Sequence, residues 1–187
     1  MEREIEGITS IMADDYAGGC LAARELLATG SIHPLIIGSE VPEYLPGTDR
    51  ICGFLQECEK AGVQAELCLI SNTLMGKKVL EHTFFEYVKK HPEVDGIFCT
   101  GDMLAAQLFT GLDLRKAEMY QKIPVIGYDG FEISGWMGLS TIAQPIAEMG
   151  ECAVEMLIKK IEGKLAPEKL TLPVRLIRRE STERFLR

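Results

Sequence analysis

The sequence predicts an α/β fold in which a mostly parallel sheet is flanked by helices. Three observations support this class: short β-rich runs bounded by turn residues, amphipathic segments between them, and the alternation of the two along the chain. Strands are expected at about 9–13, 35–38, 66–70, 95–99, 123–127, 139–143 and 171–177. Helices are expected at about 17–29, 49–61, 75–90, 102–112 and 145–162. Because strand and helix alternate, right-handed crossovers and parallel strands follow.

The helix expected over 145–162 carries the clearest pattern. Its apolar residues recur at three- and four-residue spacing on one face, and these are Ile146, Met149, Ala153, Met156, Leu157 and Ile161. Gly163 follows them, where glycine commonly ends a helix. Two features are unusual for a complete protein. The strand at 9–13 has no earlier strand to pair with, and this helix has a full apolar stripe although the preceding sheet already has enough helices.

Length, composition and charge limit the class of protein. The 187 residues (20.7 kDa) suffice for one ordinary domain or two small lobes, and 47% apolar with 26% charged residues is typical of a folded chain. Twenty Lys and Arg against 28 Asp and Glu give a net charge of -8, so this segment should repel DNA, RNA and anionic lipid. An acidic start and the lack of a long apolar run predict a cytoplasmic location.

Six cysteines are spread along the chain without a C-x-x-C pair, at Cys20, Cys52, Cys58, Cys68, Cys99 and Cys152. This spacing favours buried or half-buried thiols, because a free cysteine packs as a small hydrophobic residue. A set of disulfides and a metal site are the two alternatives.

Polar residues gather where nearly every expected strand ends. In order along the chain they are Asp14 and Asp15; Arg50, after a Pro/Gly loop; Ser71 and Asn72; Thr100, Gly101 and Asp102; Tyr128 and Asp129; and Gln144. In an open parallel sheet, ligands bind in the crevice outside the carboxyl ends of the strands, where loops and helix N-termini offer unpaired donors. The pattern therefore predicts a ligand site at this edge of the sheet.

Several of these residues also have a purely structural interpretation. Asp102 is well placed to cap a helix, as is Asp14 or Asp15 at the start of the 17–29 helix. Gln144 can hydrogen-bond at a helix start, and Tyr128 can be a wall or core aromatic. Arg50 and Asp129 are harder to explain as structure, because a cation in a first helical turn opposes the helix dipole.

No catalytic constellation is present in the sequence. The phosphate-loop, dinucleotide, nucleophile-elbow and zinc-protease motifs are all missing. His33, His82 and His91 lie at the wrong end of a strand, inside a helix and at a helix end, where none can act as a base at the crevice. Asp102 and Asp129 lack a nucleophile, metal cluster or cofactor loop beside them. The protein is therefore expected not to be an enzyme, and no cofactor or metal is expected.

Seven segments, in order, resemble the LacI/GalR family of transcriptional regulators and the related periplasmic sugar-binding proteins. They are 14–23 (D-D-Y-A-G-G-C-L-A-A), 50–54 (R-I-C-G-F), 95–105 (D-G-I-F-C-T-G-D-M-L-A), 124–130 (P-V-I-G-Y-D-G), 140–145 (S-T-I-A-Q-P), 149–153 (M-G-E-C-A) and 172–182 (L-P-V-R-L-I-R-R-E-S-T). Each motif alone is weak, but their order across nearly the whole chain is specific. The R-x-S-T tail favours the intracellular regulators.

The resemblance implies a periplasmic-binding-protein-like domain of type I, with two lobes around a cleft and three chain crossings between them. Residues 14–142 would form the C-terminal lobe, 1–13 and 143–170 remnants of the N-terminal lobe, and 171–187 a return strand and tail. The first half of the N-terminal lobe and the helix-turn-helix that reads operator DNA as a dimer would be absent. The absence of that half-lobe would explain both unusual features, the strand at 9–13 without an earlier partner and the full apolar stripe of the helix at 145–162.

The resemblance also implies roles for site residues. Arg50 would donate to ligand hydroxyls or a carboxylate, Asp129 would accept hydroxyl protons, Gln144 would contact the ligand at a crossover, and Tyr128 would line the wall. Ser71, Gly101 and Asp102 complete the expected ligand-binding set. Gly101 replaces the usual Asn, Ser71 replaces an aromatic ring found in many members, and Asp15 replaces an Asn.

The sequence therefore predicts the ligand-sensing and dimerisation domain of a LacI/GalR-type repressor. The expected effector is a sugar, a nucleoside or a derivative, which would shift the closure of the lobes. Operator DNA would be bound only through the absent domain, and no membrane partner is expected. The expected oligomeric state is a homodimer. The alternatives are a solute-binding protein of a sugar transporter and an enzyme on a flavodoxin-like sheet.

Overall fold

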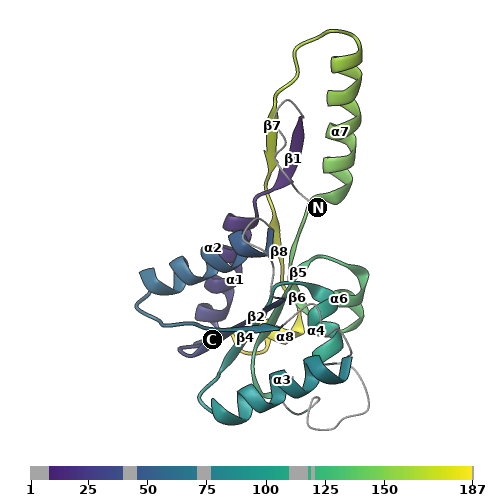
Figure 1. Ribbon diagram of the computed structural model, residues 1–187. Helices are drawn as coiled ribbons and strands as arrows, with labels where there is room; N and C mark the ends of the chain where they lie inside the picture. The colour runs from purple at the N-terminus through teal and green to yellow at the C-terminus, as the bar shows by residue number, and fades with distance from the viewer. Residues whose placement is uncertain (1–8, 40–45, 71–76, 110–117, 119–120, 187) are drawn as a thin grey trace.

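The computed structural model describes residues 9–39, 46–70, 77–109, 118 and 121–186 and contains two sheets. The strands are β1 (Ser10–Ala13), β2 (Pro34–Ser39), β3 (Glu66–Ile70), β4 (Gly96–Cys99), β5 (Val125–Asp129), β6 (Ser140–Ala143), β7 (Lys169–Leu172) and β8 (Arg175–Ile177). The helices are α1 (Asp15–Ala28), α2 (Pro46–Lys60), α3 (Lys77–Lys90), α4 (Asp102–Phe109), α6 (Glu132–Trp136), α7 (Ile146–Ile161) and α8 (Glu180–Glu183). Strand and helix alternate as predicted (Figure 1).

The larger sheet has six strands in the order β3-β2-β4-β5-β6-β8. Its first five strands pair in parallel, and β8 pairs antiparallel to β6 at one edge. The predicted mostly parallel sheet is therefore confirmed. Strand β5 runs two residues further than predicted, so Tyr128 and Asp129 lie within the strand rather than after it. The short helices α6 and α8 were not predicted.

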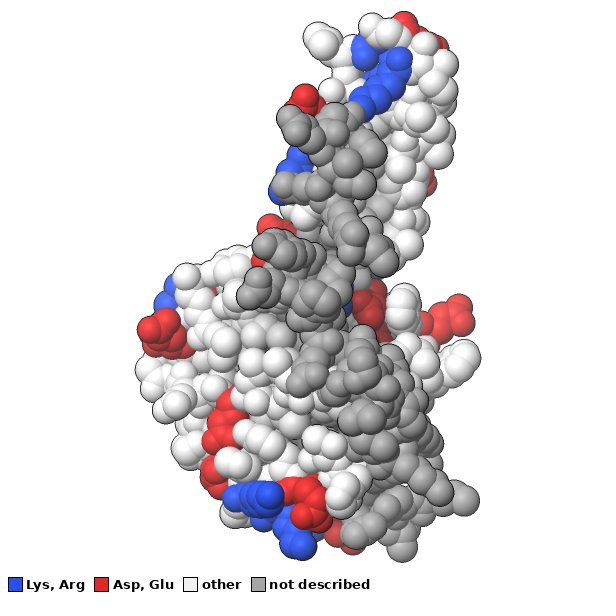
Figure 2. Space-filling view, in the orientation of Figure 1, with Lys and Arg blue, Asp and Glu red and all other residues white. Residues whose placement is uncertain are grey.

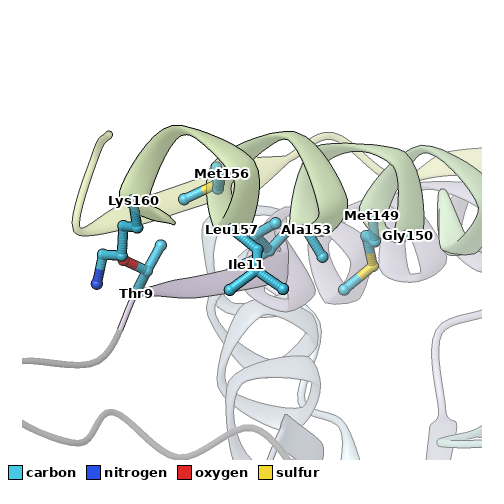
Figure 3. Close-up of a pocket in the computed structure, with 8 residues that line it drawn as sticks. All are labelled: Thr9, Ile11, Met149, Gly150, Ala153, Met156, Leu157 and Lys160. Carbon is cyan, nitrogen blue, oxygen red and sulfur yellow. The ribbon is translucent and has the colours of Figure 1, made fainter. Parts of the chain in front are cut away.

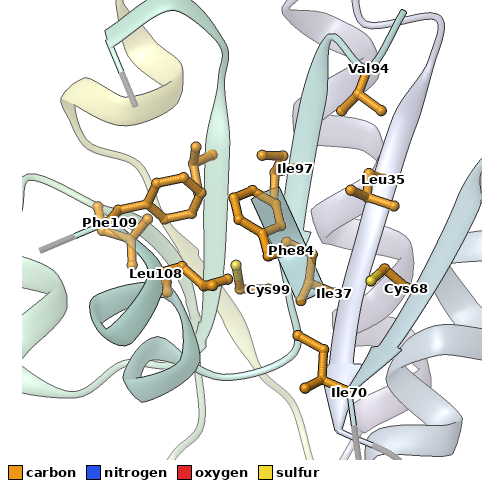
Figure 4. Close-up of a cluster of buried hydrophobic side chains, with 13 residues drawn as sticks. Leu35, Ile37, Cys68, Ile70, Phe84, Val94, Ile97, Cys99, Leu108 and Phe109 are labelled. Atoms are coloured by element: carbon orange, nitrogen blue, oxygen red, sulfur yellow. The ribbon is translucent and has the colours of Figure 1, made fainter. Parts of the chain in front are cut away.

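Both faces of the larger sheet are covered, because successive residues of its strands point to opposite sides. Leu35 and Ile37 of β2 pack with α3 and α4 in one buried cluster, which includes Phe84 and Phe109 (Figure 4). Ile36 of β2 points the other way and packs with α1 and α2. In that second cluster the rings of Phe54 and Phe98 stack 5.0 Å apart.

The smaller sheet stands apart from the larger one (Figure 1) and consists of β1 and β7 in parallel, with α7 packed beside β1. The prediction of a single strand over 171–177 is wrong, because the strand is interrupted at Pro173 and the two parts join different sheets. Residues before Pro173 pair with β1, and residues after Val174 pair with β6. Proline has no N–H to donate to a ladder, so it lies between the two sheets.

The tail is fastened to α1 and to the larger sheet by polar contacts in which Glu25, Ser181 and Thr182 are buried. Arg178 donates two hydrogen bonds of 2.8 Å to the carboxylate of Glu25 in α1, and the Thr182 hydroxyl donates a third of 2.6 Å. The Ser181 hydroxyl donates to the Val125 carbonyl oxygen and accepts from the Ser140 N–H. The R-x-S-T segment therefore closes the edge of the sheet.

No helix among these described ranges is long and apolar enough to cross a membrane.

Candidate functional site

Helices α1 and α2 approach so closely that their glycines have no room for a side chain. A Cβ at Gly19 would lie 2.0 Å from the Arg50 carbonyl oxygen, and one at Gly53 would lie 2.1 Å from the Tyr16 carbonyl oxygen. Asp14 caps α1 by accepting a 2.9 Å hydrogen bond from the Ala17 N–H. This packing brings the start of α2 over the carboxyl ends of the larger sheet.

Arg50 is held at that edge by contacts from three parts of the chain. Its Nε donates to Asp15 Oδ1 at 3.0 Å, and its Nη1 donates to the Thr100 carbonyl oxygen at 2.7 Å and to Asp129 Oδ1 at 3.1 Å. The guanidinium carbon lies 3.8 Å from the centre of the Tyr128 ring. The side chain is 11% exposed, and its Nη2 has no hydrogen-bond partner among the described residues.

Asp129 lies at the end of β5 in an unusual backbone conformation. Its φ is 106°, in a region that residues other than glycine rarely adopt and that costs about 1 to 3 kcal/mol. Gln144 fixes this conformation, because its Nε2 donates to Asp129 Oδ1 at 2.8 Å and its backbone N–H donates to the Asp129 carbonyl oxygen at 3.2 Å. Strain of this kind is commonly found where a side chain must be aimed at a ligand.

Burial sets the electrostatics of this cluster. Burial raises the pKa of the Asp129 carboxyl, although Arg50 and the Gln144 amide oppose the shift. Burial also works against the charge on Arg50, but the carboxylates of Asp15 and Asp129 outweigh it and raise the pKa of the guanidinium. One cation therefore lies between two carboxylates, and these offer hydrogen-bond acceptors next to a guanidinium donor. This arrangement suits vicinal hydroxyls, which both donate and accept.

The periplasmic binding protein-like domain family matches residues 23–182. The chain belongs to this family. It is 30% identical over 172 residues to the sucrose operon repressor of Lactococcus lactis, covering 90% of this chain and 52% of that one. It is 29% identical over 188 residues to the ribose operon repressor of Bacillus subtilis, covering 98% and 56%. The chain thus spans about half the length of these curated relatives.

Solved structures of the family have the same architecture. A LacI family transcriptional regulator from Enterococcus faecium with bound ribose superposes with a TM-score of 0.80 at 27% identity, over 96% of this chain and 68% of that one. The related proteins are transcriptional repressors rather than enzymes, as the missing catalytic motifs predicted. The predicted resemblance to LacI-type regulators and the periplasmic-binding-protein-like fold class are both confirmed.

The structure brings Arg50, Asp129 and Gln144 together at the carboxyl ends of the parallel strands, the edge where the sequence predicted them. Asp15 was expected either to cap a helix or to add a negative charge where the family has an Asn. In the structure it pairs with Arg50, and Asp14 caps the helix. The Thr100 contribution was missed because it comes from a backbone carbonyl, which leaves no signal in residue type. The doubled aspartate at 14 and 15 was the available signal for Asp15.

Two expected ligand contacts belong to the framework instead. Asp102 has no exposed surface, and its carboxylate accepts hydrogen bonds from the Gly130 N–H at 2.9 Å, the Phe131 N–H at 2.8 Å and the Thr141 hydroxyl at 2.7 Å. Burial raises the pKa of Asp102 to about 6. Tyr128 is also fully buried, beneath the Arg50 guanidinium. Neither side chain presents a surface to a ligand, so both act by positioning their neighbours.

The remaining expected residues differ in position. Gly101 lies beside Asp129: an added Cβ would be 3.3 Å from Asp129 Oδ2, which is a tight contact, and would meet no other atom of the described residues within 4 Å. The glycine therefore leaves no side chain next to the acceptor. Ser71 lies outside the residues that the structure describes.

Most cysteines follow the prediction, and one does not. Cys20, Cys58, Cys68 and Cys99 are buried, Cys152 is half-buried, and Cys52 is exposed, which makes the prediction wrong for that residue. All six thiols are free. Cys52 lies on the exposed side of α2, whose other side packs on α1 and β2.

A cavity lies between β1 and α7, away from the Arg50 cluster (Figure 3). It has a volume of about 530 Å³ and is lined by Thr9, Ile11, Met149, Gly150, Ala153, Met156, Leu157 and Lys160. Its lining is mostly apolar, with a hydroxyl and an amine at one end in the view of Figure 3. The part of the lining that the structure describes thus lacks the convergent polar groups that orient a small polar ligand.

Proposed function

We propose that this chain senses a sugar-like effector for a LacI-type transcriptional repressor, through Arg50, Asp129 and Gln144. The observation that carries the proposal is the Arg50 network, in which three separate segments converge on one buried guanidinium. Arg50 Nη2, which has no hydrogen-bond partner among the described residues, can donate to one hydroxyl of a sugar, and the Asp129 carboxylate can accept from the neighbouring hydroxyl. The ribose-bound and sucrose-operon relatives make a carbohydrate the leading ligand class.

The preformed contacts limit what the effector can be. Arg50 and Asp129 are already paired, so a ligand gains only from the positions that the pair leaves open. The space beside Gly101 gives the ligand room for a substituent at that position. We therefore include nucleosides and substituted sugars with simple sugars as candidate effectors.

The smaller sheet and α7 fit the role of an incomplete second lobe. Val154, Leu157, Ile158 and Ile161 of α7 are exposed apolar residues, which an isolated helix in water does not favour. We propose that residues 14–142 form the C-terminal lobe, that 1–13 and 143–170 belong to the N-terminal lobe, and that 171–187 return to the first. Effector bound between the lobes would then favour their closed arrangement.

An exposed apolar patch on α4 and α6 is the proposed dimer contact. Met103 is 49% exposed, Phe131 48% and Trp136 79%. Helices α4 and α6 pack against each other, so these side chains share one region. Aromatic residues and methionine are enriched in protein interfaces, and a regulator that reads a palindromic operator needs a dimer.

DNA contact is assigned to a different part of the regulator. The net charge of -8 opposes binding to phosphates. On the face shown in Figure 2, the acidic and basic side chains of the described residues form separate small groups rather than a continuous basic surface. We propose that a helix-turn-helix outside these 187 residues binds operator DNA, and that the regulator works in the cytoplasm.

Isothermal titration tests the proposal. The chain, alone and with any preceding residues that its gene encodes, would be titrated with ribose, sucrose and purine nucleosides. D129N keeps the shape of the side chain but removes the charge, and R50K keeps the charge but removes the planar fork. We expect each variant to lower the affinity for the bound effector at least tenfold.

R24A is the matched control, because Arg24 lies on α1 in an exposed ion pair with Glu57 and is remote from the Arg50 network. Its affinity should equal that of the unaltered chain. Equal affinity in D129N, R50K and the unaltered chain would overturn the site assignment. Far-UV circular dichroism of every variant separates a lost contact from a lost fold.

A further inference from the structure

A cluster of metal-ligating side chains lies at the end of the larger sheet opposite the Arg50 network. Glu66 begins β3, and His91 and Glu93 lie in the connection from α3 to β4. These positions are at the amino-terminal ends of the parallel strands, whereas Arg50 and Asp129 lie at the carboxyl ends. The cluster is thus separate from the proposed effector site.

The ligand atoms of this cluster are spaced as they would be around one ion. His91 Nδ1 lies 3.2 Å from Glu66 Oε2 and 3.2 Å from Glu93 Oε1, and the three atoms lie within 4.8 Å of one another. Nitrogen and oxygen ligands at about 2.1 Å from a zinc ion, at tetrahedral or right angles, stand about 3.0 to 3.4 Å apart. Both distances from His91 Nδ1 fall in this interval.

A neighbouring tyrosine orients both the imidazole and one carboxylate. The ring of Tyr87 stacks on the His91 ring, with centroids 4.3 Å apart and planes 13° from parallel. The Tyr87 hydroxyl donates a 2.5 Å hydrogen bond to Glu66 Oε2. Residues that hold metal ligands in place from behind are a regular part of metal sites, because they fix the orientation of each ligand.

A cavity of about 400 Å³ opens beside the cluster. Its lining includes Glu66, Glu93, His33 and Gln64. Three protein ligands leave an ion with open coordination positions, and this cavity has room for water at those positions. It also places a second imidazole, that of His33, in the same cavity.

We propose that Glu66, His91 and Glu93 bind a divalent transition-metal ion, with Zn²⁺ as the best match. One imidazole and two carboxylates are ligands that suit zinc and its neighbours in the first transition series. The two carboxylates leave the cluster negative when His91 is neutral, which favours a cation. The ion would join the α3–β4 connection to β3, the strand at one edge of the larger sheet.

The test is titration of the chain with Zn²⁺ alone, in a C52S/C152S background so that the two accessible thiols do not bind the metal. We expect one Zn²⁺ per chain. H91A, E66Q and E93Q should each weaken binding at least tenfold. Co²⁺ is the second probe, since its visible absorption changes with its ligands, and H91A should abolish the protein-bound spectrum.

H82A is the matched control, because His82 is an exposed histidine on α3 that does not belong to the cluster. It should bind Zn²⁺ as tightly as the background protein. No uptake of Zn²⁺, or equal affinity in H91A and H82A, would overturn the proposal. Loss of stability in H91A without any metal uptake would show instead that an imidazolium is clamped between two carboxylates. D129N should leave Zn²⁺ binding unchanged, which separates this test from that of the effector site.

Discussion

Replacing Gly19 by alanine tests whether the close approach of α1 and α2 holds Arg50 in place. A Cβ at this position would lie 2.0 Å from the Arg50 carbonyl oxygen and 2.8 Å from the Phe54 backbone nitrogen. Both atoms belong to the backbone of α2, so no side-chain rotation can relieve the contacts. The two helices would have to move apart by more than an ångström, which would displace Arg50 from Asp15 and Asp129.

Two opposing free energies set the magnitude of this effect. Alanine favours a helix over glycine by about 1 kcal/mol, whereas overpacking a rigid contact costs about 1 to 3 kcal/mol, and more where backbone must move. We expect G19A to lower the free energy of unfolding by about 2 kcal/mol. For a chain of this size, that corresponds to a fall in Tm of about 4 to 8 °C.

Gly150→Ala is the matched control, since it is the same substitution in another helix. A Cβ at Gly150 meets no atom of the residues that the structure describes within 4 Å, so G150A should gain about 0.5 to 1 kcal/mol of stability from helix propensity alone. Urea unfolding followed by far-UV circular dichroism measures both variants. If G19A unfolds at the same urea concentration as G150A, the argument from helix contact is wrong.

Three further predictions concern buried or exposed polar groups. D102A should lower the free energy of unfolding by about 3 kcal/mol because it removes the buried acceptor of three hydrogen bonds, while D102N, which keeps one carbonyl oxygen, should lose clearly less in the same urea experiment. Burial raises the pKa of Glu25, but the hydrogen bonds from Arg178 and Thr182 outweigh burial and lower it. The ionised carboxylate therefore stabilises the fold at any pH above the ordinary carboxyl pKa. This stabilisation is lost as the pH falls through the lowered pKa. E25Q should therefore be less stable at pH 7 and lose less unfolding free energy between pH 5 and pH 3. If urea unfolding shows the same pH profile for E25Q and the unaltered chain, the hydrogen bonds of Glu25 with Arg178 and Thr182 do not stabilise the fold in this way. In thiol titration of the native chain, Cys52 should react first and C52S should remove the fast phase, since Cys99 is buried with a raised pKa.

The sheet could be predicted from the sequence because its signals are local. Consecutive residues such as Ile36 and Ile37 point to opposite faces of a strand, and both are apolar, which indicates a strand covered on both faces. The division of 171–177 into β7 and β8 could not be predicted, because it depends on which strands lie on either side of Pro173. Only the folded arrangement shows that one sheet ends there and another begins.

The site was predictable to the extent that it depends on strand order. Arg50, Asp129 and Gln144 converge because the carboxyl ends of parallel strands meet at one edge. The role of Asp102 could not be read in the same way, since an aspartate at a helix start has the same sequence signal whether it caps its own helix or accepts from a neighbouring loop. Depth of burial decides between the two, and burial at a loop depends on tertiary packing.

The clasp between Glu25 and the tail sets an order for folding during synthesis. Arg178 and Thr182 lie 153 and 157 residues after Glu25 along the chain. Helix α1 therefore emerges from the ribosome long before its buried carboxylate can find partners, and β8 cannot complete the larger sheet until β7 has been made. Contacts of such long range form late and slowly. A nascent chain paused before residue 175 would carry an open sheet edge and an unpaired glutamate, which is the state that a chaperone would recognise.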